Sequence, residues 1–225
     1  MFFWDPTFIL LIPALILAAW AQGKLSRTYA RYSKERSARG ITGAQAARRI
    51  LDSSGLSAVN IERVAGNLTD HYDPRSKVLR LSEGVFGSDS IAAVGIAAHE
   101  VGHAIQHKNA YAPLSIRNAF VPVVNFGSFM AWPLFILGFL LRTPLLIQLG
   151  ILFFSGAVLF QLITLPVEFD ASRRALAQIS EGGYLTAEEV SGARRVLNAA
   201  ALTYVAAAAM AILQLLRMIL LSRRR

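Results

Sequence analysis

Four apolar segments are the strongest constraint on how this chain of 225 residues can fold. A helix needs about 20 predominantly apolar residues to cross the hydrocarbon core of a bilayer. The segments that approach or meet this length are residues 2–22, 121–141, 145–165 and 199–221. The first has neither the basic flank nor the cleavage site of a signal peptide, so we expect an uncleaved anchor. The sequence therefore predicts a membrane protein with about four transmembrane helices.

The overall composition favours the same class of protein. Charged residues make up 16% of the chain, whereas soluble domains carry about 25%. A net charge of +9 would suggest nucleic acid as the partner of a soluble protein. Here the basic residues flank apolar segments, so we expect a lipid bilayer and no nucleic acid as partner. The absence of cysteine excludes disulfides and thiolate metal ligands.

Basic residues also predict the orientation in the membrane, because cytoplasmic loops are enriched in Lys and Arg. The stretch after the first segment holds Lys24, Arg27, Arg31, Lys34, Arg36 and Arg39, and the stretch after the third holds Arg173, Arg174, Arg194 and Arg195. We expect both stretches to be cytoplasmic, with the turn at residues 142–144 outside. Residues 223–225, all arginine, disagree with the rule if the fourth segment crosses completely.

Residues 99–103 (His-Glu-Val-Gly-His) form an HExxH motif. We expect a helix over about residues 90–109, on which His99 and His103 share a face and can bind one Zn²⁺. Glu100 lies beside that face and can act as a base on a metal-bound water. The alternative is two core histidines with a salt-bridged glutamate. Burying three ionisable groups without such a role would be costly, so we favour the metal site.

A catalytic zinc site needs a third protein ligand and an open position for water. The three-histidine extension of the motif is excluded, because Gln106 and Asn109 occupy the places of its glycine and histidine. His107 lies one turn beyond His103. Three successive positions at this spacing run nearly parallel to the helix axis and cannot easily surround one ion, so we expect a supporting or structural role for His107.

A carboxylate after the third apolar segment is the favoured third ligand. Glu168 is predicted to lie on the same side of the membrane as the two histidines. Asp170 is the competing candidate, on a different helix face. Either residue could instead pair with Arg173 and Arg174.

The stretch between the first two apolar segments has the character of a globular region. We expect a helix over residues 42–51 with Thr42 as its N-cap, a strand at residues 61–64, and a hairpin around residues 73–76. His71 falls on this hairpin and is our candidate donor to the oxyanion of the reaction, although a surface role is equally compatible. Tyr204, in the fourth segment, is a second candidate donor.

Three separated motifs resemble the YugP-like neutral zinc metallopeptidases, which are bacterial integral-membrane proteins. They are LTDHYDPRSKVLRL (residues 68–81), AAHEVGHAIQH (97–107) and LPVEFDASRRAL (165–176). The resemblance implies a gluzincin-type site with His99 and His103 as ligands, Glu100 as base and Glu168 as third ligand. A more distant similarity is to the HtpX-like and CAAX-prenyl membrane proteases, whose third ligand begins a Glu-x-x-x-Asp motif. Ser172 occupies that aspartate position here, and Asp170 could substitute for it.

These inferences define one expected architecture: a mainly α membrane protein with a zincin-like HExxH helix and a small β-hairpin or sheet. We divide the chain into a transmembrane anchor (1–22), a cytoplasmic zincin-like region (23–120), a transmembrane helical hairpin (121–165), a cytoplasmic segment with the third ligand (166–198), and a fourth transmembrane helix with a basic tail (199–225).

The expected function is that of a zinc metalloendopeptidase in the bacterial inner membrane, with its active site facing the cytoplasm. Its substrates would be peptides or membrane-associated or misfolded proteins. One alternative is a zinc-stabilised membrane scaffold or adaptor without turnover, which would not need Glu100. Another is a zinc amidohydrolase acting on a non-protein amide; the cytoplasmic orientation argues against peptidoglycan as its substrate.

Overall fold

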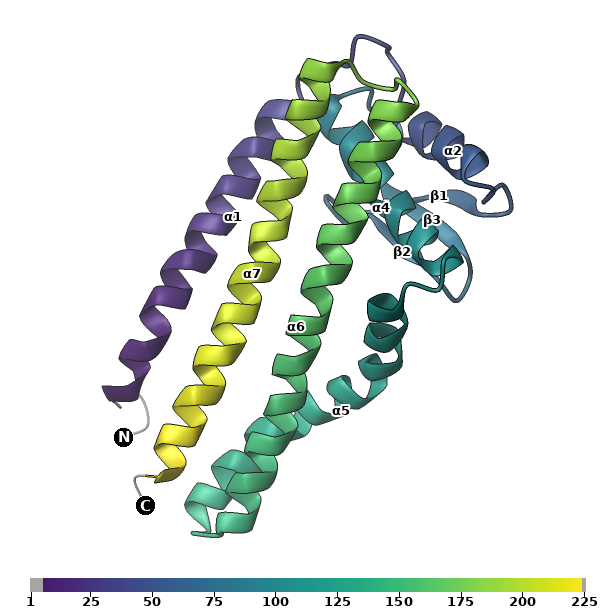
Figure 1. Cartoon of the computed structure of the whole chain (residues 1–225). Helices are drawn as coiled ribbons and strands as arrows, with labels where there is room; N and C mark the ends of the chain where they lie inside the picture. The colour runs from purple at the N-terminus through teal and green to yellow at the C-terminus, as the bar shows by residue number, and fades with distance from the viewer. Residues whose placement is uncertain (1–5, 224–225) are drawn as a thin grey trace. The chain divides into compact units, whose positions relative to one another are not determined.

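The computed structural model describes residues 6–223 and shows a mainly helical protein with one three-stranded sheet (Figure 1). Residues 1–5 of the expected anchor, and Arg224 and Arg225 of the basic tail, lie outside the described residues. The helices are a 3-10 helix at Pro6–Leu11, α1 (Ile12–Tyr32), α2 (Gly43–Ser53), α3 (Glu83–Phe86), α4 (Ile91–Lys108), α5 (Ala112–Leu140), α6 (Pro144–Glu181) and α7 (Ala187–Arg223). The strands are β1 (Asn60–Val64), β2 (His71–Asp73) and β3 (Val78–Ser82).

The chain divides into two compact units. The first unit comprises the chain up to Gln22, Ser115–Pro166, and the chain from Leu202 on. The second unit comprises Gly23–Leu114 and Val167–Ala201. The HExxH motif, the sheet and Glu168 all belong to the second unit.

The first unit contains the apolar segments. Four helical stretches are long and apolar enough to cross a membrane: Pro6–Tyr32, Ala112–Leu140, Pro144–Glu181 and Ala187–Arg223. Large apolar side chains on them stay exposed, for example Phe129 with 75% of its surface accessible, as expected of lipid-facing residues. The four expected membrane helices are thus confirmed by length and composition.

All four helical stretches are longer than the apolar segments that predicted them, and the first continues to Tyr32. α5 begins at Ala112, α7 begins at Ala187, and α6 continues past Pro166 to Glu181. A proline inside a helix removes one backbone hydrogen bond, yet such prolines are tolerated in membrane helices where neighbouring groups compensate. Residues 167–181 therefore continue the helix α6 beyond the third apolar segment.

In the second unit, α2 begins where the sequence predicts it. The Thr42 hydroxyl accepts a hydrogen bond from the Gln45 backbone N–H, and the Gln45 side chain accepts one from the Thr42 N–H. This reciprocal pair is a capping box. Gly43 lets α2 approach α3 closely, since a Cβ at this position would lie 2.3 Å from the carbonyl oxygen of Val85.

The sheet has the strand order β1-β3-β2. β2 and β3 form the expected antiparallel hairpin, with Tyr72 opposite Leu79. The turn between them is closed by Asp73, whose carboxylate accepts hydrogen bonds from the Ser76 hydroxyl and the Arg75 N–H, and these lower its pKa to about 2. β1 pairs with β3 in parallel, a pairing that the sequence did not predict. β2 therefore lies at an edge of the sheet.

α4 is the central helix of the second unit, and its N-cap is Ser90, whose hydroxyl accepts a hydrogen bond from the Ala93 N–H. Most of its side chains are small and buried, so neighbouring elements can come close to its backbone. The buried cluster around it includes residues from α2, β3, α6 and α7, namely Ile50, Leu51, Leu79, Leu81, Ile179 and Val196. The HExxH motif thus stands on a helix that is held on several sides.

Candidate metal centre

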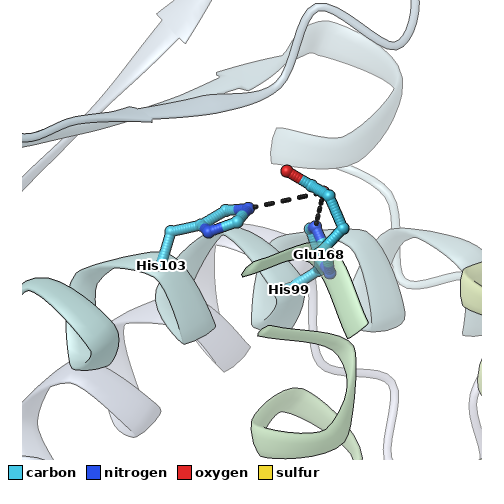
Figure 2. Close-up of side chains that lie close together, drawn as sticks. All are labelled: His99, His103 and Glu168. Carbon is cyan, nitrogen blue, oxygen red and sulfur yellow. Dashed lines mark hydrogen bonds and ion pairs between the residues drawn. The ribbon is translucent and has the colours of Figure 1, made fainter. Parts of the chain in front are cut away.

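His99 and His103 on α4 and Glu168 on α6 point toward one another (Figure 2). The Nε2 atoms of His99 and His103 lie 3.3 Å and 3.7 Å from Oε2 of Glu168. One donor atom from each residue lies within 4.8 Å of the other two. Donors bound tetrahedrally to one zinc ion at about 2.0–2.1 Å lie roughly 3.3 Å apart. Two imidazole nitrogens and one carboxylate at these distances therefore fit a zinc ion.

The electrostatics of the site also favour a cation. His103 and Glu168 are buried, and Glu100 is buried beside them on α4. Burial by itself lowers the pKa of His103, but the hydrogen bond to Glu168 and the charges of Glu100 and Glu168 outweigh this effect and raise it. The same negative field would stabilise a metal ion between the histidines.

Each histidine has a neutral polar partner at its other ring nitrogen. Nδ1 of His99 lies 3.1 Å from the Ser172 hydroxyl, and Nδ1 of His103 lies 3.0 Å from Oε1 of Gln106. A carbonyl oxygen can only accept a hydrogen bond, so Nδ1 of His103 carries the proton. In the neutral ring, Nε2 of His103 then carries the lone pair that can bind a metal ion.

The two helices that carry the ligands cross in close contact. A Cβ at Gly102 would lie 2.6 Å from the carbonyl oxygen of Ala171 on α6, so only glycine permits this approach without a shift of the backbone. The contact places the turn of α6 that contains Glu168 beside the motif.

With this geometry in view, comparison with known proteins identifies the family. A family model described as "Putative neutral zinc metallopeptidase" matches residues 7–223. The chain belongs to this family. It is 52% identical, over 212 residues that make up 94% of each chain, to "Putative membrane protease YugP" of Bacillus subtilis (strain 168). No solved structure matches the chain. The resemblance expected from the three motifs is thus confirmed.

In this member of the zinc metallopeptidase family, the structure brings Glu168 to the two histidines and directs Asp170 elsewhere. The Asp170 carboxylate accepts hydrogen bonds from the side chains of Arg173, Arg174 and Gln106. Ser172, at the position of the aspartate in the Glu-x-x-x-Asp motif, contacts His99, whereas Asp170 reaches His103 only through Gln106.

Of the remaining two histidines, His107 lies in the last turn of α4 and His71 lies on β2. Nδ1 of His107 lies 3.0 Å from the hydroxyl of Tyr72 on β2, and this contact joins the last turn of α4 to the edge strand. His71 is exposed on β2, and its Nδ1 lies 2.8 Å from the carbonyl oxygen of Thr69. Tyr204, the second candidate donor, lies on α7 in the first unit.

The sequence did not reveal that Gln106 and Ser172 contact the two histidines of the motif. In the sequence, Gln106 stands out only as a mismatch to the three-histidine motif. Its position offered a clue, since it is a polar residue within a helix of small apolar ones and follows His103 by less than one turn.

Proposed function

We propose that this chain is a membrane-embedded zinc metalloendopeptidase of the gluzincin type. His99, His103 and Glu168 hold the zinc ion, and Glu100 is the general base. One observation carries the proposal. The donor atoms of His99, His103 and Glu168 converge beside a helix that bears an intact HExxH motif. Three protein ligands leave the fourth position open, as catalysis requires and as a purely structural site does not.

The chemistry follows from the positions of the side chains. When bound, zinc would lower the pKa of a water molecule and polarise the peptide carbonyl. Glu100 follows the first ligand directly in α4, so its carboxylate can accept the proton of the attacking water and pass it to the leaving amine. Because Glu100 is buried, it meets little competition from bulk water for this proton.

The edge strand β2 is our candidate for substrate binding. It lies at the open edge of the sheet and is tied to α4 by the contact between Tyr72 and His107. An extended peptide can add to such an edge through main-chain hydrogen bonds. We therefore propose unfolded segments of membrane-associated or misfolded proteins as substrates.

His71 on β2 remains our candidate donor to the oxyanion. A carbonyl oxygen accepts the hydrogen bond of its Nδ1, so Nε2 is the nitrogen that would face the substrate. This nitrogen donates only when the ring carries both protons.

The location that we propose is the bacterial inner membrane, with the zinc site on the cytoplasmic side. The four candidate spans and the membrane protease named above support a membrane location, and the basic residues support the orientation. The division of the chain at residues 22, 120, 165 and 198 follows from this orientation.

The ligand assignment predicts a clear order of zinc affinities. Glu168→Gln should weaken zinc binding more than about 100-fold, because the substitution removes a ligand. Loss of a residue that only supports a ligand typically weakens binding about 10–100-fold. Asp170→Asn should still bind one zinc per chain, about 10-fold more weakly. Competition with a chromogenic chelator on the purified protein measures both. An Asp170→Asn variant that loses more affinity than Glu168→Gln would refute the assignment.

Catalysis by Glu100 predicts a variant that binds zinc but does not cleave. Glu100→Gln should retain one zinc per chain and lose about 10²–10⁴-fold in kcat on an unfolded protein substrate. His71→Ala should also retain zinc and lose about 10²-fold in kcat if His71 stabilises the oxyanion. Cleavage by Glu100→Gln at the wild-type rate would refute the mechanism. A wild-type protein with full zinc and no hydrolysis of any peptide would favour the scaffold.

The absence of cysteine allows a direct test of orientation. Ser57→Cys labels the exposed loop before β1, and Thr143→Cys labels the turn between α5 and α6. In intact cells, a membrane-impermeant maleimide should react with the cysteine at position 143 and spare the one at position 57. After lysis, both should react. The reverse pattern in intact cells would place the zinc site outside.

A further inference from the structure

Gln106 is a buried polar residue that the proposed mechanism does not use. Its side chain is fully buried in α4, and its amide makes three hydrogen bonds. Oε1 accepts from Nδ1 of His103 at 3.0 Å. Nε2 donates to the carbonyl oxygen of Val167 at 2.8 Å and to Oδ2 of Asp170 at 2.9 Å. The last two partners can only accept, which fixes the orientation of the amide.

The two partners on α6 stand on either side of Glu168 in the sequence. The oxygen of the Gln106 amide thus faces a ligand from α4, and its nitrogen faces the turn that carries the ligand from α6. An amide group is planar, so the two ends cannot move independently. A displacement of α6 relative to α4 would break at least one of these hydrogen bonds inside the protein, where unpaired polar groups are costly.

We infer that Gln106 is a positioning residue of the metal centre that fixes the His103 ring for binding through Nε2 and holds the Glu168 turn of α6 against α4. The inference rests on the zinc-binding part of the proposed function. One neutral side chain would thus align two ligands that come from different helices.

The charges around Gln106 explain why an amide serves here and a carboxylate does not. Asp170 is already paired with Arg173 and Arg174. A carboxylate at position 106 could still accept the proton of His103, but it could not donate to Val167 or Asp170. It would also face the negative charge of Asp170 at hydrogen-bonding distance. The two functions of the amide can therefore be separated by substitution.

Three variants of the full-length protein test this inference through zinc affinity, measured by competition with a chromogenic chelator. Gln106→Met keeps the length of the side chain and should bind zinc about 10–100-fold more weakly. Gln106→Glu keeps the acceptor for His103 and should still lose at least about 10-fold. The double variant Gln106→Glu/Asp170→Asn restores a donor–acceptor pair across the two helices and should bind zinc more tightly than Gln106→Glu alone.

A matched control separates positioning from general loss of stability. Val94→Ala removes a fully buried side chain from the same helix, away from the three ligands. It should lower the melting temperature and leave zinc affinity unchanged. With Co²⁺ in place of zinc, the visible absorption band should shift in Gln106→Met and not in Val94→Ala.

The outcomes distinguish the inference from the proposal on which it rests. If the wild type binds zinc and Gln106→Met binds it equally well, Gln106 has no positioning role and the proposed function stands. If Gln106→Glu alone binds as tightly as the wild type, the link to α6 is not needed and the inference is wrong. If the wild type binds no zinc, the proposed function fails first.

Discussion

The close crossing of α4 and α6 at Gly102 is the contact on which the metal centre depends. The HExxH helix carries the two proposed histidine ligands and the proposed base, but the proposed third ligand lies on a helix more than sixty residues further along the chain. The carbonyl oxygen of Ala171 occupies the space that any side chain at position 102 would need. Because Ala171 lies within the segment from Glu168 to Ser172, this contact brings both Glu168, the proposed third ligand, and Ser172, the partner of His99, to the motif.

Polar side chains are buried at this crossing, and they have hydrogen-bond partners there. His99 contacts Ser172, His103 donates to Gln106, and Gln106 donates in turn to α6. An unpaired polar group in such a place would cost about 1–3 kcal/mol. Most of the other residues of α4 before its last turn are apolar, and they pack against α2, β3 and α7, which restrains the helix on the side away from the proposed ligands. That combination of a restrained helix and satisfied polar groups is what a preorganised metal site requires.

The elements with local signals could be predicted from the sequence. The capping residue Thr42 marks the start of α2, the turn at Asp73 marks the hairpin, and the apolar lengths mark the membrane helices. The features that depend on distant contacts could not be predicted. The parallel pairing of β1 with β3 has no local pattern, and the polar residues after Leu165 gave no indication that α6 continues through Pro166. The residues of the candidate site that lie in recognisable motifs could be predicted. The contacts of Gln106 could not, because they depend on α6 lying beside α4.

We propose that one zinc ion is held by two histidines of α4 and one glutamate of α6. X-ray absorption spectroscopy of the zinc-loaded protein measures this coordination directly. We predict a first shell of two imidazole nitrogens at about 2.0–2.1 Å with oxygen donors from a carboxylate and a water. A third imidazole in the first shell, which only His71 or His107 could supply, would contradict the account, as would a shell without imidazole.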